Sequence, residues 1–389
     1  MIETTDSRDA AGSGSSTSTA PLRVLLVDVS DRGGIARYCA SLRAALRREG
    51  ASVSLAAPDG LADAGLSLAR RHWGPDVSGL ARARLLGRRL VEIGPSTLFL
   101  GRAVVRARCD VVHVHTEVVP LFDHLVLGAI ARRVPVVITA HDPEPLHGGA
   151  RALEREARRW RAADAVIIHG EGQRPLVESS APGVAVHVVP VDLDLGGPPV
   201  PRAEARRRLG LDEAPTALLL GLIRPYKGID LLADVWPQVT ARVPGARLVV
   251  AGEPYACPDL DRLERQEGVE IRRGFIDEDE FDCYAAAPDV LVLPYHRGSH
   301  SGILHRGAAA GTPVLASPSL ADEVRRTGAG LVVPMDRTAW SDALVTALSG
   351  HPPPPPPAVT GRATAVGTLA VYRDVLDRRT RSSRRRRPS

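Results

Sequence analysis

Lysine, cysteine and aromatic residues are scarce in this sequence. It contains a single lysine, Lys227, against 49 arginines, and only 4% of its 389 residues are aromatic. The four cysteines lie far apart and form no CxxC pair, which argues against a disulfide framework and against a cysteine-based zinc site. We therefore expect a reduced, cytoplasmic protein.

Long apolar runs are also missing. The only long stretch without charge, Ala343 to Gly361, contains six consecutive prolines, so no membrane-spanning helix is expected. Residues 1–20 are polar and Ser-rich, lack the apolar core of a signal peptide, and are expected to be a disordered tail. The remaining composition, 44% hydrophobic and 24% charged, is typical of a chain with a sizeable core, and the length indicates two domains.

Charge is distributed unevenly along the chain. Residues 21–195 are basic on balance and 196–377 acidic, whereas 378–389 contain seven arginines and no acid and are expected to be disordered. Leu80 to Ile93 has the pattern of a basic amphipathic helix, which suits either peripheral docking on an anionic membrane surface or a solvated Arg face with Leu packed inward. Aromatics are few and no DNA- or RNA-binding motif occurs, so specific nucleic-acid recognition is not expected.

Short apolar runs alternate with helical patterns in two series. This alternation predicts two α/β domains with doubly wound parallel sheets, one over 21–195 and one over 196–350. Gly196 to Pro215, rich in Gly, Pro and Arg, is predicted to be the linker between them, and 351–377 a Pro-rich spacer followed by a last helix, Arg362 to Asp377. The predicted strands are 23–28, 52–57, 111–115, 134–140, 165–169 and 186–190 in the first series, and 216–222, 247–251, 269–272, 290–294 and 314–316 in the second.

Open parallel sheets bind ligands at the carboxyl ends of their strands, and three loops of this kind contain candidate binding residues. Gly33 and Gly34 lie between a strand and a helix N-terminus, which suits either an anion or a tight turn that needs glycine. Arg297 to Arg306 places Ser299, Ser301 and Gly302 before a small-residue helix. These residues could donate to phosphate or sugar oxygens, or Ser301 could be an ordinary helix cap.

The segment Gly221 to Asp230 gives the sharpest indication of a site. Arg224 and Lys227 follow a strand and precede a helix that begins near Ile229. Two cations at a sheet's carboxyl edge suit a diphosphate, which needs neutralisation as it leaves, and the alternative is a pair of solvated surface cations. In a chain that otherwise uses arginine, a compact ammonium suggests a point-charge role.

Histidines lie at or just past the ends of strands in the first series. His141, followed by Asp142, lies just past a strand and could donate to a sugar hydroxyl or phosphate, although such a histidine is as often structural. His113 and His115 are expected in the core or the cleft wall, and Glu117 is a candidate acceptor contact. The sequence has no HExxH and no clustered Asp ligands, so no dedicated metal site is expected.

As an ordered set these segments resemble the family-4-like glycosyltransferases of GT-B fold. The matching pieces span about residues 22–345: the Gly33-Gly34 loop, VVITAHDP ending at Pro143, LIRPYKG ending at Gly228, VVAGE ending at Glu253, RGFI ending at Ile276, YAAAPDVLVLPY ending at Tyr295 and GTPV ending at Val314. The resemblance implies two Rossmann-like domains that face each other across a cleft. It also implies transfer of a sugar from a nucleoside-diphosphate donor, usually with retention and without a required metal or other cofactor.

The resemblance also implies roles for individual residues. Arg224 and Lys227 would bind the donor diphosphate, with Gly33 and Gly34 approaching from the other domain. His141 would contact the transferred sugar, and the backbone at Phe275 and Ile276 would hold the base. The donors to phosphate and sugar would be Ser299, Ser301 and Gly302.

One departure from the family pattern concerns its two glutamates, eight positions apart. Gly298 and Arg306 occupy those positions, as in a branch that lacks the pair. Pro190-Val191-Asp192 also departs from the common Pro-His-Gly.

Three functions therefore stay open. The first is a glycosyltransferase acting on a glycan, lipid-linked or small-molecule acceptor, on the cytoplasmic face of the membrane or in solution. The second is a nucleotide-sugar epimerase with the same cleft. The third is a non-catalytic scaffold or partner subunit, which the missing glutamates favour and the retained Arg224, Lys227 and His141 oppose.

Overall fold

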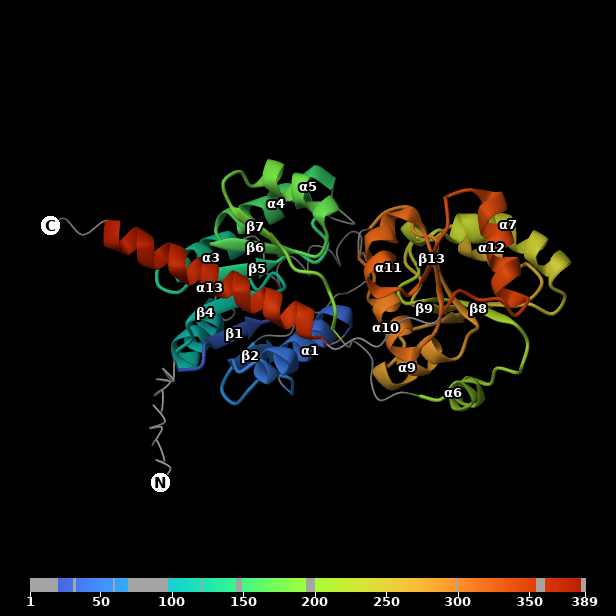
Figure 1. The fold of residues 1–389 in the computed structure, drawn as a ribbon, viewed down its shortest axis with the longest axis horizontal. Coiled ribbons are helices and arrows are strands. Elements are labelled where there is room, and N and C mark those ends of the chain that lie inside the picture. The colour runs from blue at the N-terminus through green and yellow to red at the C-terminus, as the bar shows by residue number, and fades with distance from the viewer. Residues whose placement is uncertain are drawn as a thin grey trace, which may run out of the picture.

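The alternating pattern of the sequence folds into two parallel sheets, each with helices on both faces (Figure 1). The computed structural model describes residues 20–30, 33–58, 60–68, 97–119, 122–144, 149–193, 200–298, 300–354 and 361–385. The expected tail at 1–19, the amphipathic helix at Leu80 to Ile93, and Ser299 lie outside these residues.

The first domain contains a seven-stranded parallel sheet of order β3-β2-β1-β4-β5-β6-β7. Its chain order reverses between β1 and β4, and such a switch point leaves a crevice at the carboxyl ends of the two strands. The elements are β1 Arg23–Val27, α1 Gly34–Arg48, β2 Ser52–Pro58, β3 Ser67–Leu68, a helical segment over 97–107, β4 Val111–Val114, α3 Asp123–Ala131, β5 Val136–Thr139, α4 Gly149–Arg161, β6 Ala165–Ile168, α5 Arg174–Ser180 and β7 Ala185–Val188.

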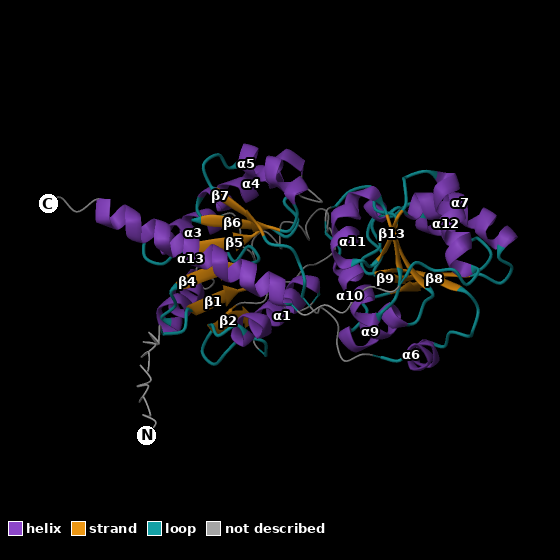
Figure 2. Cartoon of the chain, in the orientation of Figure 1, coloured by secondary structure: helices purple, strands orange, loops and turns teal. Residues whose placement is uncertain are grey.

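The second domain repeats this design, with helices around a central sheet (Figure 2). Its six-stranded parallel sheet has the order β10-β9-β8-β11-β12-β13, with a switch point between β8 and β11. The elements are α6 Arg202–Leu209, β8 Thr216–Leu220, the short 3-10 helix η2 Pro225–Lys227, α7 Ile229–Arg242, β9 Arg247–Gly252, α8 Leu260–Glu264, β10 Val269–Arg273, α9 Glu278–Ala286, β11 Val290–Leu293, α10 Gly302–Ala310, β12 Val314–Ala316, α11 Ala321–Thr327, β13 Gly330–Val332 and α12 Arg337–Leu348. The prediction of two doubly wound sheets is confirmed, although β3 and β13 were not predicted.

Strand composition follows from burial on both faces. In β1, Val24 and Leu26 pack into one core cluster, whereas Leu25 and Val27 pack into the cluster on the opposite face. All four side chains are at most 1% exposed. A parallel sheet covered on both faces therefore needs continuous apolar runs, which is the pattern seen in the sequence.

The last helix, α13 Arg362–Arg385, returns to the first domain and packs beside α1 (Figure 1). Leu369 and Tyr372 are buried in the same cluster as β1, and the Tyr372 hydroxyl hydrogen-bonds His113 Nδ1 at 2.6 Å. The expected crossover helix is therefore confirmed, and the first domain's core is completed by residues from the far end of the chain.

Two predictions about connecting segments were wrong. The predicted linker contains α6, which begins at Arg202, packs against α9 and ends at Gly210 in the left-handed conformation that caps helices. The arginine-rich end continues α13 to Arg385 instead of being disordered from 378. Arginine favours helix, and Arg379 forms a two-bond contact with the Asp164 carboxylate at 2.9 and 2.7 Å. Among the helices of the described residues, none has both the length and the apolar character needed to cross a bilayer.

Truncation of a buried α13 side chain should destabilise the first domain. We expect Leu369→Ala, at a site only 4% exposed, to lower the free energy of unfolding by about 2–4 kcal/mol, because it removes buried methyl groups and leaves a cavity. Urea unfolding followed by circular dichroism measures the change. Val366→Ala is the matched control, since Val366 is 47% exposed on the same helix and should change stability by less than about 0.5 kcal/mol. Equal losses in the two variants would contradict the observed packing of α13.

Candidate functional site

The only lysine is buried where β8 ends. Lys227 closes η2, is 5% exposed, and donates from Nζ to the carbonyl oxygen of Leu220 at 2.8 Å. The next residue, Gly228, has φ +74°, and a Cβ there would clash with the carbonyl of Pro294 just after β11. Glycine thus lets the Lys227 loop pack against the end of β11, so the ammonium lies at the second domain's switch point.

Electrostatics make this ammonium unusual. Burial, together with the charge of nearby Arg224, lowers the pKa of Lys227 to about 7. The Arg224 guanidinium lies 4.9 Å from the centre of the Tyr255 ring, and Lys227 Nζ lies 5.7 Å from that of Tyr295. The predicted pair of cations is therefore brought together beside aromatic rings, and an anion bound there would favour the charged form of both.

The N-terminus of α10 lies next to this pair. Ser301 is its N-cap and accepts a 3.4 Å hydrogen bond from the Leu304 N–H, so the alternative of a helix cap is confirmed. Gly302 is the first helical residue. Phe275, 45% exposed, and the partly buried Ile276 follow β10 at the same carboxyl edge. Their assignment to the base, and those of Ser301 and Gly302 to phosphate and sugar, stay predictions.

Glu323, in the first turn of α11, was not predicted as a site residue. Its side chain is 2% exposed, and Oε2 accepts from the Ser301 N–H at 2.9 Å. Oε1 accepts from His300 Nδ1 and from His305 Nε2, the second at 3.3 Å. This buried carboxylate therefore positions the start of α10. His300 and His305 were not predicted as site residues either, and Glu323 lies eighteen residues beyond His305.

The glycine pair of the first domain starts α1. Gly33 is the N-cap with φ +88°, a conformation that favours glycine, and a Cβ at Gly33 or Gly34 would meet no atom within 4 Å. The turn interpretation is thus confirmed for Gly33. The open space above both glycines leaves their backbone accessible, and contact with an anion stays a prediction.

Three histidines form a chain of hydrogen bonds across the carboxyl ends of β4, β5 and β6. His115 Nδ1 lies 3.3 Å from His141 Nε2, and His141 Nδ1 lies 3.3 Å from His169 Nε2. The chain ends where His169 Nδ1 meets the carbonyl oxygen of Val189 at 3.0 Å.

The carbonyl oxygen of Val189 determines which ring nitrogen carries the proton in each of these three histidines. A carbonyl only accepts, so His169 must carry its proton on Nδ1, which makes its Nε2 an acceptor when the ring is neutral. His141 then donates from Nδ1 and accepts at Nε2, and His115 donates from Nδ1. Burial lowers the pKa of all three rings, which agrees with this neutral arrangement. Both nitrogens of His141 are therefore engaged, so its predicted contact with a sugar requires one of these bonds to open.

Two other polar residues of β4 and the loop after it, His113 and Glu117, are also buried. His113 is fully buried and hydrogen-bonds Thr139 Oγ1 at 2.7 Å as well as Tyr372, in agreement with its expected place in the core. Glu117 is 8% exposed and lies 3.7 Å from the Arg155 guanidinium, which neutralises it. Its role as an acceptor contact stays a prediction.

The two domains meet at this edge. Arg326 of α11 donates to the carbonyl oxygen of His169 at 3.2 Å, and the His169 and His300 rings lie 5.2 Å apart. Burial raises the pKa of the Asp142 carboxyl, and the His300 charge of the other domain partly offsets that rise. The His141-Asp142 turn therefore faces the α10 loop.

The positions of the family's glutamates are filled differently. Arg306 is 5% exposed, donates to Asp282 Oδ1 at 3.1 Å and stacks 4.2 Å above the Phe281 ring. Asp282 also lies 3.7 Å from Arg37 of α1, across the domain boundary. A carboxylate is thus present here after all, supplied by α9 instead of α10.

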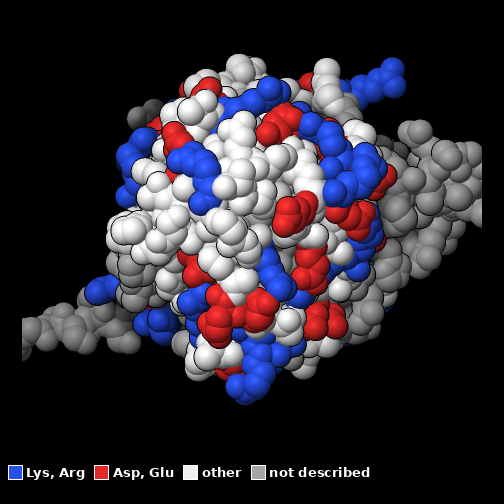
Figure 3. Space-filling view, turned by 90° about the vertical axis from the view of Figure 1, so that its right-hand side faces the viewer, with Lys and Arg blue, Asp and Glu red and all other residues white. Residues whose placement is uncertain are grey.

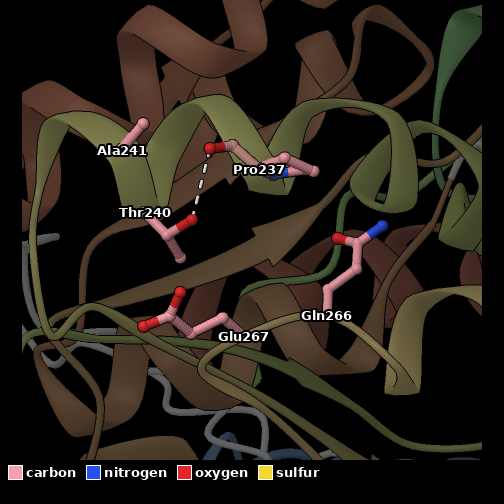
Figure 4. Close-up of a pocket in the computed structure, with 5 residues that line it drawn as sticks. All are labelled: Pro237, Thr240, Ala241, Gln266 and Glu267. Carbon is pink, nitrogen blue, oxygen red and sulfur yellow. Dashed lines mark hydrogen bonds between the residues drawn. The ribbon is translucent and has the colours of Figure 1, made fainter.

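A hollow of about 380 Å³ lies away from this region (Figure 4). Pro237 and Thr240 line it from the C-terminal half of α7, and Glu267 from the segment before β10. Since these segments lie at the amino ends of the strands, the hollow is at the edge opposite the Lys227 loop. On the outer end of the same domain, basic and acidic side chains are interspersed (Figure 3). The carboxyl edges of the two sheets therefore define the candidate site.

Two family matches agree with this architecture. Residues 32–195 match "Glycosyltransferase Family 4" and residues 214–350 match "Glycosyl transferases group 1". Each match covers most of one domain. The chain belongs to the family-4-like glycosyltransferases of GT-B fold.

Relatives with assigned functions match over part of the chain. A GDP-mannose-dependent alpha-(1-6)-phosphatidylinositol monomannoside mannosyltransferase of Mycobacterium tuberculosis is 34% identical over 167 residues, 39% of this chain and 43% of that protein. A D-inositol 3-phosphate glycosyltransferase of Segniliparus rotundus is 30% identical over 217 residues, 49% of this chain and 47% of that protein. The chain thus spans about half the length of these relatives or less.

Solved structures match over nearly the whole fold. Sucrose-phosphate synthase from Thermosynechococcus elongatus superposes with a TM-score of 0.62 at 18% identity, covering 94% of this chain and 98% of the other. Anabaena HepE in complex with UDP and glucose gives a TM-score of 0.57 at 17% identity, covering 93% and 99%. At these identities the likeness establishes the fold alone.

Acid should destabilise the first domain through its buried neutral histidines. Burial lowers the pKa of His113 to about 3, against an ordinary value of 6.5. Below 6.5 the unfolded chain therefore binds more protons, so the free energy of unfolding falls as the pH drops toward 3, by about 1 kcal/mol per pH unit for each such imidazole.

Urea unfolding between about pH 7 and about pH 5 measures this slope. We expect His113→Gln to reduce it, and His351→Gln, at an exposed position, to leave it unchanged. A slope in His113→Gln equal to that of the wild type would show that this imidazole does not carry the effect.

Proposed function

We propose that this protein is a glycosyltransferase that moves a sugar from a nucleoside-diphosphate-sugar donor to an acceptor. The observation that carries the proposal is the meeting of Lys227, Arg224 and the N-terminus of α10 at the switch point of the second sheet. The His141-Asp142 turn of the first domain faces them. Two cations and a helix N-terminus suit a diphosphate, and the facing domain would help to exclude water from a donor bound there.

The charge state of Lys227 explains how the leaving group would be stabilised. A buried ammonium with a pKa of about 7 is charged only in part at neutral pH. A diphosphate in contact with Nζ would restore the full charge, and this charge would be aimed where negative charge develops as the sugar bond breaks. Arg224 would also bind the diphosphate, through two N–H groups of its guanidinium.

The proposal also covers the stereochemistry of transfer, the need for a metal and the kind of acceptor. We expect retention, with the acceptor attacking from the face that the diphosphate leaves and without a protein nucleophile. The two cations take the part that a metal plays in other sugar-nucleotide enzymes, so transfer needs no metal. The acceptor is a glycan, a lipid-linked sugar or a small molecule.

Peripheral contact of the first domain with an anionic membrane would suit a lipid-linked acceptor. Leu98, Phe99 and Val105 are 53%, 40% and 76% exposed on the helical segment 97–107, and Arg102 and Arg106 of the same segment are also exposed. The phosphatidylinositol monomannoside mannosyltransferase named above supports an acceptor of the glycolipid type, whereas the D-inositol 3-phosphate glycosyltransferase supports a small-molecule acceptor.

Loss of either cation should abolish most of the transfer. We expect Lys227→Ala or Arg224→Ala to lower turnover by at least ~10²-fold, since each removes a preorganised charge at the leaving group. Transfer from UDP-, GDP- and ADP-sugars to glycolipid and small-molecule acceptors measures it, with GDP-mannose first because the mycobacterial relative depends on it. Arg242→Ala is the control, because this exposed arginine pairs with the exposed Asp342, away from the Lys227 loop.

The transfer assay and a nucleotide-binding measurement together separate the alternative functions. An epimerase would convert the donor in the absence of an acceptor. A scaffold would bind none of UDP, GDP and ADP in a calorimeter. Near-normal transfer by both cation variants would remove Lys227 and Arg224 from the mechanism and with them the basis of the proposal.

Nucleotide binding should take up a proton above neutral pH. At about pH 8 the free ammonium of Lys227, with its pKa of about 7, is mostly deprotonated, and a bound diphosphate raises that pKa. Binding therefore draws up to one proton from the buffer at about pH 8 and less at about pH 6, where the group is already charged.

Calorimetry in two buffers of different ionisation enthalpy measures the proton number. In Lys227→Met the uptake should vanish even if weak binding persists. Equal proton uptake in Lys227→Met and wild type would assign the proton to another group.

A further inference from the structure

His300, His305 and Glu323 converge at the start of α10, at the boundary with the first domain. One ligand atom from each of the three lies within 4.8 Å of the other two. His305 and Glu323 are 0% and 2% exposed in their side chains, and His300 is 13% exposed. Three potential metal ligands are thus gathered in the interior from two helices and the loop between β11 and α10.

The donor set and its spacing fit Zn²⁺. Zinc binds imidazole nitrogen and carboxylate oxygen at about 2.0–2.2 Å in tetrahedral sites, which places neighbouring ligand atoms roughly 3.3 Å apart. His305 Nε2 lies 3.3 Å from Glu323 Oε1. His300 Nδ1 hydrogen-bonds the same oxygen, so this contact would have to lengthen when a metal enters.

The hydrogen bonds at Glu323 mark where the ion would sit. Two imidazole nitrogens are turned toward the single oxygen Oε1, and each presents a proton to it. One dication between the three atoms can replace both protons, whereas Oε2 keeps its bond from the Ser301 N–H. Glu323 therefore has one oxygen available to a metal and a second that holds its orientation, as metal-binding carboxylates commonly do.

We infer that His300, His305 and Glu323 form a Zn²⁺ site that joins the N-terminus of α10 to α11. Three protein ligands leave a fourth position, which a water molecule or an anion oxygen fills. The ion would hold the Ser301 loop in place beside the Lys227 pair. Its role is to position this loop, and the transfer step proposed above does not pass through it. The site stands independently of that function.

Metal binding to the full chain tests the site directly. We expect protein stripped with a chelator to bind one equivalent of Zn²⁺ in a calorimeter with a Kd below about 10 µM. Co²⁺ in place of Zn²⁺ should give the intense visible absorption bands of a four-coordinate ion. Absence of stoichiometric Zn²⁺ binding, or Co²⁺ bands typical of octahedral solvent-like coordination, overturns the inference.

Matched variants locate the ion. Glu323→Gln keeps the side-chain shape and an oxygen for the Ser301 N–H, and should weaken Zn²⁺ binding by at least ~10²-fold, as should His305→Gln. His296→Gln is the control, because His296 also pairs with a carboxylate, Asp230 at 2.7 Å, but on the surface of the same domain. Circular dichroism confirms that each variant is folded. Unchanged binding in both cluster variants, or a loss in His296→Gln, places the metal elsewhere and overturns the inference.

Discussion

The buried ammonium of Lys227 is the constraint around which the site is organised. The buried ammonium donates a hydrogen bond to the carbonyl oxygen of Leu220. Gly228 lets the loop that carries it pack against the end of β11. Burial leaves the free group only partly charged at neutral pH, and an anion bound beside it interacts with the ammonium more strongly than it would with a solvated lysine. The position of η2, the approach of α10 and the close packing at the switch point all serve to hold this group out of water.

The facing edge of the first domain contains buried neutral histidines instead of buried cations. Its histidines are kept neutral by burial and by a tautomer order that begins at one backbone carbonyl, that of Val189. The first domain thus presents uncharged, oriented rings, whereas the second presents cations and a positively polarised helix end. This division suits a cleft in which one domain binds the charged part of a ligand and the other meets its uncharged part.

Contacts between segments that are distant in sequence hold the carboxyl edges of the two sheets close to each other. The carbonyl of His169 accepts from Arg326, and Glu323, one turn earlier on the same helix, positions Ser301. Helix α11 therefore contacts both the first domain and the Ser301 loop. Tyr372, from the other end of the second domain's sequence, closes the first domain's core through His113. The core of the first domain is therefore built from two separate pieces of chain, whereas the core residues of the second domain come from one continuous stretch.

Much of this could be predicted from the sequence. The strand order along the chain, the glycine loops, the Lys227 segment and the crossover helix are local patterns, because a doubly buried strand needs an apolar run and a left-handed turn needs glycine. The α6 helix and the helical continuation to Arg385 were also local, but their composition resembled that of linkers and tails.

What only the tertiary structure decided is which side chains share an edge. The order β1-β4-β5-β6 brings His115, His141 and His169 together from segments more than fifty residues apart in all. Packing of α11 against α10 brings Glu323 to His300 and His305, and α9 supplies Asp282 where the family has an acid on α10. The sequence determined the elements and the cation pair. Strand pairing and burial determined the proton positions of the histidines and the convergence on Glu323, because both depend on distances between elements that no local pattern encodes.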